Sequence, residues 1–215
     1  MDQKLLFLIN RQWTSPGLDW LMAALSSFDA WGPVLLTLAL GVLWRGGFRA
    51  RAFVLTAALI VGINDGVISN TLKKLVDRPR PHQSVNEVRQ VDLAKATPRV
   101  LALFQPVKVK LSQASLEEVE GRSFPSSHTM NTFSAALVAL AFYGRRVAWG
   151  LGLAAAVAYS RVYTGSHWPS DVVVSVVLGL GSTLLLLALA ERLWQRAGRR
   201  WWPAMQARHP SLLAT

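Results

Sequence analysis

The sequence predicts an all-α integral membrane protein, a helical bundle of about five transmembrane helices with an interfacial helix at the N-terminus. Of the 215 residues, 52% are hydrophobic, and many of them gather in windows with almost no charge. A helix needs roughly 20 apolar residues to cross the hydrocarbon of a bilayer, close to the length of these windows. Basic residues are concentrated in short segments beside the windows, as in membrane proteins. A single soluble domain, which the length alone would allow, is therefore disfavoured.

The N-terminal part of the chain predicts a surface segment and then a bent helix. The apolar stretch within residues 1–19 is too short for a cleaved signal peptide, so we expect an amphipathic segment in the membrane interface. The first long window, Trp20–Trp44, contains Asp29, Gly32 and Pro33. Because glycine and proline loosen a helix, this window predicts one long span bent near its middle.

The second window, Ala52–Leu72, becomes polar in its second half. Asn64, Asp65 and Ser69 lie there, shortly before Lys73. Polar side chains within a span are costly unless they face the interior of the bundle, so this end of the helix should line a cavity. For Asp65, lining the site and pairing with a neighbouring helix are both open.

Three further windows complete the predicted bundle: His128–Tyr143, Val147–Ser160 and Val172–Ala190, the first of which is short. Together the five windows define a membrane-embedded domain over residues 20–190. Residues 191–215 follow as a basic, tryptophan-rich tail. Such a tail suits the headgroup region and is predicted to be cytoplasmic.

Residues 82–122 form the one long segment without a predicted span. The segment carries scattered charge and a moderately apolar stretch, "VLALFQPVKVKL". Long loops without secondary structure are uncommon unless they are functional. The segment is expected outside the membrane, either as a cap on its surface or as a gate over a site, and both interpretations stay open.

A formal net charge of +11 is typical of nucleic-acid-binding proteins, but its placement here indicates a membrane. Ten of the 23 Lys and Arg residues lie in the short segments after the first, third and fifth windows. Short cytoplasmic loops of membrane proteins carry such an excess. We therefore expect membrane lipids, and no nucleic acid, as partners. Cysteine is absent, which excludes disulfides and thiolate metal sites.

Three polar clusters at the ends of the windows carry the candidate chemistry. "KKLVDRPRP" follows the second window, "SFPSSH" opens the third, and "SRVYTGSHWPSD" lies between the fourth and the fifth. Antiparallel helices bring these three points to one membrane face, opposite the ten basic residues. The candidate residues are Lys73, Arg80, Ser126, Ser127, His128, Arg161, His167 and Asp171.

The three cations Lys73, Arg80 and Arg161 predict a phosphate site. They converge where two helices begin, and a helix N-terminus offers unpaired N–H groups and a positive dipole end. Arginine forks match phosphate oxygens in pairs, and such donors also stabilise the charge that develops in phosphoryl transfer. Two histidines accompany the cations, which anion binding alone would not require.

These two histidines predict a nucleophile and an acid. Pro169 can open the fifth helix, and Asp171 in its first turn can then bend back towards His167. A carboxylate on one ring nitrogen fixes the tautomer and leaves the other nitrogen as a nucleophile. We therefore assign His167 as the nucleophile and His128 as the proton donor to the leaving oxygen.

Together and in this order, the clusters resemble the type 2 phosphatidic acid phosphatase superfamily. Its pattern is Lys-x6-Arg-Pro, Pro-Ser-Gly-His and Ser-Arg-x5-His-x3-Asp, and the resemblance covers about residues 52–190. It implies an all-helical bundle and a metal-independent phosphatase in which His167 forms a phosphohistidine, Asp171 orients His167, and His128 is the general acid. The resemblance also implies contacts to the phosphoryl group from Lys73, Arg80, Ser126, Ser127 and Arg161.

One position departs from the pattern, because Ser127 stands where the superfamily has glycine. A serine backbone N–H can still hold a phosphate if its φ is negative. A left-handed conformation would cost on the order of 1 kcal/mol and would weaken this contact without changing the resemblance.

Other polar residues are expected to take no part in the chemistry. For Arg78 and Lys74, which lie off the pattern, we expect contact with solvent or lipid headgroups. His82 and His209 have no partner pattern, and no two of the four histidines lie at ligand spacing. We therefore expect no metal and no cofactor.

The predicted function is a membrane lipid phosphatase that removes a terminal phosphate from a lipid phosphate or diphosphate. Undecaprenyl diphosphate is favoured, with phosphatidylglycerophosphate, phosphatidic acid and lipid A as alternatives that present a similar head. A phosphatase for water-soluble esters is a second interpretation; vanadate-dependent haloperoxidases share the constellation but are soluble. A non-catalytic lipid-binding protein or transporter would normally lack a catalytic residue, and none is missing here. The oligomeric state is not indicated.

The charge pattern also predicts location. The short chain, the absence of cysteine and the basic loops favour a multi-pass protein of the bacterial inner membrane. Because the short basic loops lie on the opposite face, the catalytic face should be periplasmic or exterior. The catalytic side holds the other 13 basic residues, but several serve chemistry and a long loop counts less.

Overall fold

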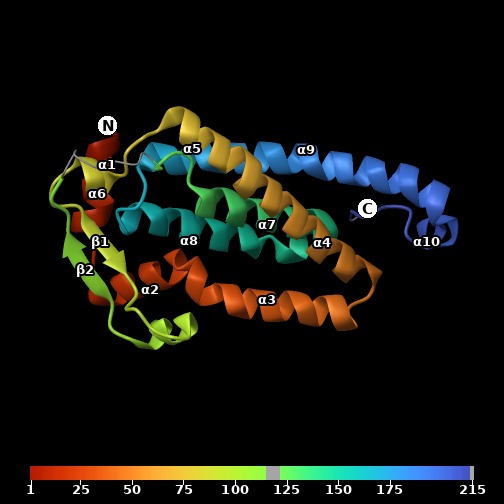
Figure 1. Ribbon diagram of the computed structural model, residues 1–215, viewed down its shortest axis with the longest axis horizontal. Coiled ribbons are helices and arrows are strands. Elements are labelled where there is room, and N and C mark those ends of the chain that lie inside the picture. The colour runs from red at the N-terminus through yellow and green to blue at the C-terminus, as the bar shows by residue number, and fades with distance from the viewer. Residues whose placement is uncertain (115–121, 214–215) are drawn as a thin grey trace.

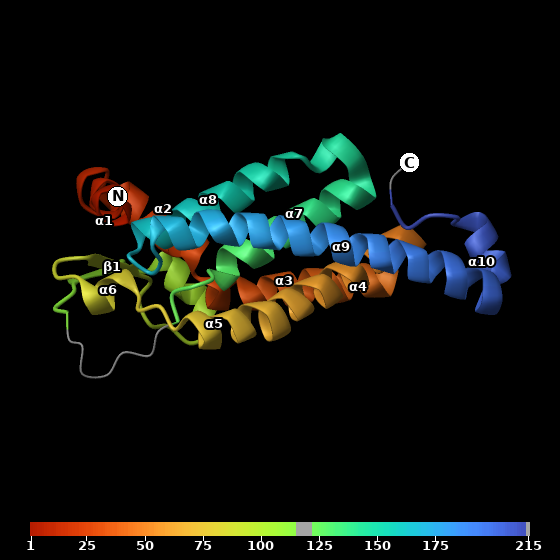
Figure 2. The same cartoon turned by 90° about the horizontal axis from the view of Figure 1, so that it is seen from above.

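The computed structural model describes residues 1–114 and 122–213, and most of them form a bundle of helices (Figure 1). The long helices are α3 (Phe28–Arg45), α4 (Phe48–Ile63), α7 (Ser127–Tyr143), α8 (Trp149–Tyr163) and α9 (Pro169–Trp201). α7 packs against α4, α8 and α9. The N-terminus and both strands lie at one end of the bundle, and the C-terminus lies towards the other (Figures 1 and 2).

Among the residues that the structure describes, two segments are long and apolar enough to cross a membrane. They are Phe48–Ser84, which continues α4 through the π-helix η2 (Asn64–Ser69) and α5 (Asn70–Val76), and Pro169–Trp201. A third counts if α2 (Pro16–Ser26) and α3 form one bent span. With 17 and 15 residues, α7 and α8 are shorter than the roughly 20 of a straight span. The predicted fold class, an all-α membrane bundle, is confirmed. All five windows form helices. In the described ranges, two or three helical segments are long and apolar enough to cross a membrane.

The first window is bent, but not where the sequence predicts it. α2 ends at Ser26, α3 begins at Phe28, and the two axes differ by 53°. Pro33 lies inside α3. The expectation of a bend near Gly32 and Pro33 is therefore wrong, because the chain leaves the helical conformation at Ser27 instead.

Two side chains donate to carbonyl groups at the end of α2, beside this break. The indole N–H of Trp31 donates to the Ala24 carbonyl at 2.9 Å. Arg161 donates to the Ser26 carbonyl at 3.1 Å. Backbone groups need such partners where water is scarce. The break thereby ties the end of α2 to one of the predicted site residues.

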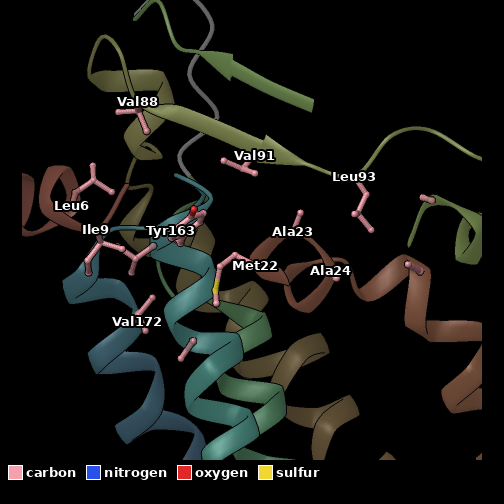
Figure 3. Packing of buried hydrophobic residues seen from close by; sticks show 14 of the residues in the cluster. Leu6, Ile9, Met22, Ala23, Ala24, Val88, Val91, Leu93, Tyr163 and Val172 are labelled. Carbon is pink, nitrogen blue, oxygen red and sulfur yellow. The ribbon is translucent and has the colours of Figure 1, made fainter. Parts of the chain in front are cut away.

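The N-terminal segment packs against the end of the bundle. α1 (Asp2–Phe7) and the π-helix η1 (Leu8–Gln12) contact the start of α9 and the end of α8. Leu6 and Ile9 are buried in one hydrophobic cluster with Tyr163 (Figure 3). Whether this segment also lies in a membrane interface stays a prediction.

The segment over residues 82–122 contains secondary structure that the sequence analysis did not anticipate. α6 (Pro81–Ser84) is followed by β1 (Arg89–Asp92), the 3-10 helix η3 (Arg99–Phe104) and β2 (Lys108–Leu111). β1 and β2 pair in an antiparallel sheet. The period-2 alternation of "VKVKL" was the signal for β2.

This segment is anchored to the bundle by apolar side chains. Val88, Val91 and Leu93 are buried in the same cluster as the N-terminal helix (Figure 3). The gate or cap expected over residues 82–122 includes 115–121, which lie outside the described residues. The described part forms a wall over one end of the bundle.

At the opposite end, α7 and α8 are joined by the 3-10 helix η4 (Gly144–Val147). After α9, the short helix α10 (Pro203–Arg208) leads the chain back, so that His209 stacks on Phe48 with ring centroids 4.2 Å apart. The last two residues of the predicted tail, 214–215, lie outside the described residues.

Two glycines allow close approaches that position the site. A Cβ at Gly179 would lie 2.8 Å from the carbonyl oxygen of Met130, so glycine lets α9 lie close against α7. Gly165 has φ +70°, and a Cβ there would lie 2.6 Å from the Arg89 carbonyl oxygen. The turn that leads to His167 therefore requires glycine.

Candidate active site

The three polar clusters lie at the same end of the bundle, as the antiparallel arrangement predicts (Figure 1). A cavity of about 400 Å³ opens there, and Arg80, His128 and Arg161 of the predicted set line it. Other walls of the cavity are formed by residues of strand β1 and by residues at the break between α2 and α3. The cavity is therefore bounded by the membrane bundle on one side and by the 82–122 segment on the other.

Arg161 is almost buried, with 8% of its surface exposed. One terminal nitrogen donates to the carbonyl and the hydroxyl of Ser26. Its Nε is buried without a hydrogen-bond partner among the described residues. Because buried polar atoms are nearly always paired, this N–H still lacks the partner that a bound anion can supply.

Lys73 is held by the serine that replaces glycine. Its Nζ donates to Ser127 Oγ at 2.6 Å, and Ser69 Oγ lies 2.7 Å from the same hydroxyl. In the described ranges, the non-glycine residues with positive φ are Asp77 and Glu87, so Ser127 is free of left-handed strain. The condition for a phosphate contact from the Ser127 backbone N–H is therefore met.

Ser126 lies behind the cavity and is fully buried. Its backbone N–H donates to Ser175 Oγ at 2.8 Å, and its hydroxyl accepts from Thr129. This N–H is thus used to join α7 to α9. A phosphate contact from Ser126 stays a prediction, and it would have to come from the hydroxyl.

His167 is 3% exposed, and its Nδ1 lies 2.6 Å from the carbonyl oxygen of Ser123. A carbonyl can only accept a hydrogen bond, so Nδ1 carries the proton and Nε2 keeps its lone pair. Burial, followed by the positive charges of Arg161 and Arg80, holds the pKa of His167 well below its ordinary value. The ring is therefore neutral at neutral pH, as a nucleophile requires.

The expectation that Asp171 contacts His167 directly is wrong. Its fully buried carboxylate accepts from the Ser123 hydroxyl and from Arg78, both at 2.5 Å, and from the Trp168 N–H at 3.1 Å. Asp171 occupies the first turn of α9, where capping the Trp168 N–H turns the carboxylate towards these donors. It reaches the histidine through Ser123.

Arg78, for which we expected a solvent or headgroup role, is part of this network. It pairs with Asp171 and, at 2.7 Å, with Asp2, and it lies over the Trp168 ring. Asp2 also accepts from the Ser170 N–H at the start of α9. The sequence signal for this role of Arg78 was Asp171 itself, because a carboxylate that becomes buried requires a cation as its partner.

His128 lines the cavity from the first turn of α7, and its ring lies 6.1 Å from that of Phe28, edge to face. His82 also lines the cavity and contacts the Gly165 carbonyl through Nδ1 at 3.1 Å. Within the part of the chain that the structure describes, no three His, Cys, Asp or Glu residues are grouped as metal ligands.

The sequence model of the PAP2 superfamily matches residues 50–195, which include all three clusters. The chain belongs to the PAP2 superfamily. It is therefore a membrane phosphatase, a hydrolase of phosphate esters, within a family of lipid phosphatases.

Individual relatives agree with this family. The chain is 25% identical to lipid A 4'-phosphatase of Bacteroides thetaiotaomicron over 91% of its own length and 80% of the relative's. It is 30% identical to phosphatidylglycerophosphatase B of Escherichia coli strain K12, over 76% of this chain and 72% of that one. An undecaprenyl-diphosphatase of Sulfolobus acidocaldarius is 42% identical over 26% of this chain and 28% of its own.

The fold is also similar to a solved structure. The crystal structure of Aquifex aeolicus LpxE matches with a TM-score of 0.58 at 23% identity, and the match covers 87% of this chain and 94% of that one. At this identity the similarity supports the fold, which the PAP2 superfamily shares, and not a particular substrate.

Proposed function

We propose that this PAP2 phosphatase removes the terminal phosphate of a membrane lipid through a phosphohistidine on His167. One observation carries the assignment: the proton-bearing Nδ1 donates to the Ser123 carbonyl, which leaves the lone pair of Nε2 for attack near the positive charges of Arg161 and Arg80. An anion site alone would need no such nucleophile.

In the proposed reaction, Lys73, Arg80, Arg161 and the backbone N–H of Ser127 hold the phosphoryl oxygens. His167 Nε2 attacks phosphorus while the bond to the leaving oxygen breaks, and His128 gives that oxygen a proton. Water then attacks the phosphohistidine with His128 as base, and inorganic phosphate leaves. The fixed cations stabilise the charge that develops in both steps.

Asp171 is a positioning residue in this scheme. It holds Ser123, whose carbonyl in turn fixes the tautomer and the orientation of the His167 ring. Arg78 balances the charge of Asp171 and fixes its direction.

A lipid substrate is supported by the apolar approach to the cavity. Phe28 lines the cavity beside His128 and is 57% exposed, and Trp31, one turn further along α3, is 40% exposed. An acyl or prenyl chain can therefore lie against α3 while its head reaches the cations. A water-soluble ester would not need these exposed aromatic side chains.

Among lipids, undecaprenyl diphosphate is the first candidate, and a relative that matches 26% of this chain is named for it. Lipid A is the second candidate, because a relative named for it matches most of the chain. We place the enzyme in the bacterial inner membrane with the cavity outside the cytoplasm, supported by the basic loops at the other end.

Phosphate release by the purified protein in detergent tests the function. The panel is undecaprenyl diphosphate, phosphatidylglycerophosphate, phosphatidic acid and phosphorylated lipid A, with His167→Ala as the inactive control. We expect release from at least one lipid by the wild type and none by the variant. Release that survives in His167→Ala, or none from any lipid, would overturn the proposal.

A further inference from the structure

A second cavity, of about 730 Å³, adjoins the cavity of the candidate active site. The two share four lining residues: Asp29, Gln90, Asp92 and Arg99. The second cavity is also lined by three lysines, Lys95, Lys108 and Lys110. Four positive side chains thus face two carboxylates in a space that the proposed chemistry does not use.

The two-stranded sheet brings part of this charge together. Asp92 lies opposite Lys108, and Gln90 lies opposite Lys110. Because side chains alternate along a strand, these four residues share one face of the sheet. Val91 points to the other face, where it is buried in the core. One face of the sheet therefore holds it to the bundle, and the other presents lysines to the cavity.

The four positive side chains of the second cavity differ in whether other residues hold them in place. Arg99 donates to a backbone carbonyl at 2.7 Å and lies 3.8 Å from Asp92, so its position at the junction of the cavities is fixed. Lys95, Lys108 and Lys110 are exposed, and within residues 1–114 and 122–213 none of them lies within 4.0 Å of a carboxylate oxygen. Their ammonium groups are available to a ligand.

We infer that this basic cavity binds a second phosphate on the head group of the lipid whose terminal phosphate lies at His167. The inference rests on the proposed function and narrows its substrate class. A lysine cluster with an anchored arginine is suited to a phosphate. The two phosphates of a diphosphate are directly linked and lie close together, whereas the three lysines line a separate cavity. The second cavity therefore favours a head group whose phosphates are separated by a spacer such as a sugar, and it disfavours undecaprenyl diphosphate, the first candidate above.

The same lysines could attract a phosphate from neighbouring anionic lipids of the membrane. Continuity favours the substrate's own phosphate, because Gln90, Asp92 and Arg99 line both cavities. A head group that enters the site therefore extends directly into the basic cavity. An experiment can distinguish the two sources of phosphate. If the lysines bind neighbouring anionic lipids, their loss should affect every substrate alike.

The test compares monophosphoryl and bisphosphoryl forms of one acylated disaccharide in neutral detergent micelles. The variant is Lys108→Gln with Lys110→Gln, at two exposed positions of β2. Arg145→Gln with Arg146→Gln removes the same charge from exposed positions at the other end of the bundle and is the matched control. Both double variants should turn over p-nitrophenyl phosphate like the wild type.

We expect the KM of the bisphosphoryl lipid to rise about fivefold or more in the lysine variant, with kcat and the monophosphoryl KM unchanged. An unchanged KM ratio would overturn the inference. So would a loss that affects both lipids and occurs only when phosphatidylglycerol is added to the micelles. If the wild type releases phosphate from neither lipid nor p-nitrophenyl phosphate, the proposed function itself fails.

Discussion

Replacing Ser123 by alanine separates an indirect role of Asp171 from a direct one. The Ser123 hydroxyl donates to Asp171 at 2.5 Å, while its carbonyl lies 2.6 Å from His167 Nδ1. Ser123→Ala keeps the carbonyl and removes the hydroxyl. The carboxylate then no longer holds the residue that orients the nucleophile.

The expected loss follows from the burial of the two partners. Ser123 and the Asp171 side chain both have 0% exposure, so water does not replace the missing bond. A hydrogen bond to a charged group contributes about 1.5–3 kcal/mol, and about 1.4 kcal/mol corresponds to a tenfold change in rate. If the whole contribution is lost in the transition state, phosphoenzyme formation slows about 10- to 150-fold. KM should change little, because neither residue lines the cavity.

Rapid-quench measurement of phosphoenzyme formation from p-nitrophenyl phosphate is the assay. Ser123→Ala, Asp171→Asn and the double variant are compared with Ser182→Ala, which loses a hydroxyl bonded to carbonyls of its own helix. Because Ser123 and Asp171 act in series, the double variant should be no slower than the slower single variant. Losses that multiply in the double variant, or a wild-type rate in Ser123→Ala, would refute the relay.

Three further predictions concern topology, metals and protonation. Reporter fusions after Arg146 and after Arg200 should both report cytoplasm, and a periplasmic signal from both would invert the orientation. Lipid dephosphorylation should persist in excess EDTA, because fixed cations supply the charge that a metal would; loss restored by magnesium would contradict this. The third is read from ¹⁵N-histidine spectra of the free enzyme, with the His167 signals assigned by their loss in His167→Ala. At pH about 6.5, less than half of the His167 rings should carry the second proton, and the neutral form should have its one proton on Nδ1. Burial lowers its pKa, so protonation should set in only at more acidic pH, and a ring charged at pH about 6.5 would disagree.

Much of the fold was predictable because hydrophobic length is a strong local signal. Each of the five apolar windows forms a helix, and the antiparallel order brings the three clusters to one end. The position of the bend was not predictable from Pro33. The break lies at Ser27, where Arg161 contacts the end of α2 from a position 135 residues away along the chain, a contact that no local pattern predicts.

The clusters of candidate site residues lie at one end of the bundle as expected, but the hydrogen bonds that connect them were not predictable. Motif spacing identifies His167 and Asp171, yet it cannot tell that Ser123 stands between them. Ser123 and Asp2 reach Asp171 and Arg78 from distant parts of the chain. Such long-range contacts leave no periodic pattern in a single sequence.

The central claim is that His167 carries the phosphoryl group. His128 donates a proton when the phosphohistidine forms and acts as the base when it is hydrolysed. Trapping of ³²P label on the protein during turnover of an aryl phosphate tests it most directly. An aryl leaving group departs without a proton, so His128→Ala should form the phosphoenzyme and, lacking the base for its hydrolysis, accumulate it. We predict acid-labile, base-stable label on His128→Ala and none on His167→Ala; label on His167→Ala would contradict the account.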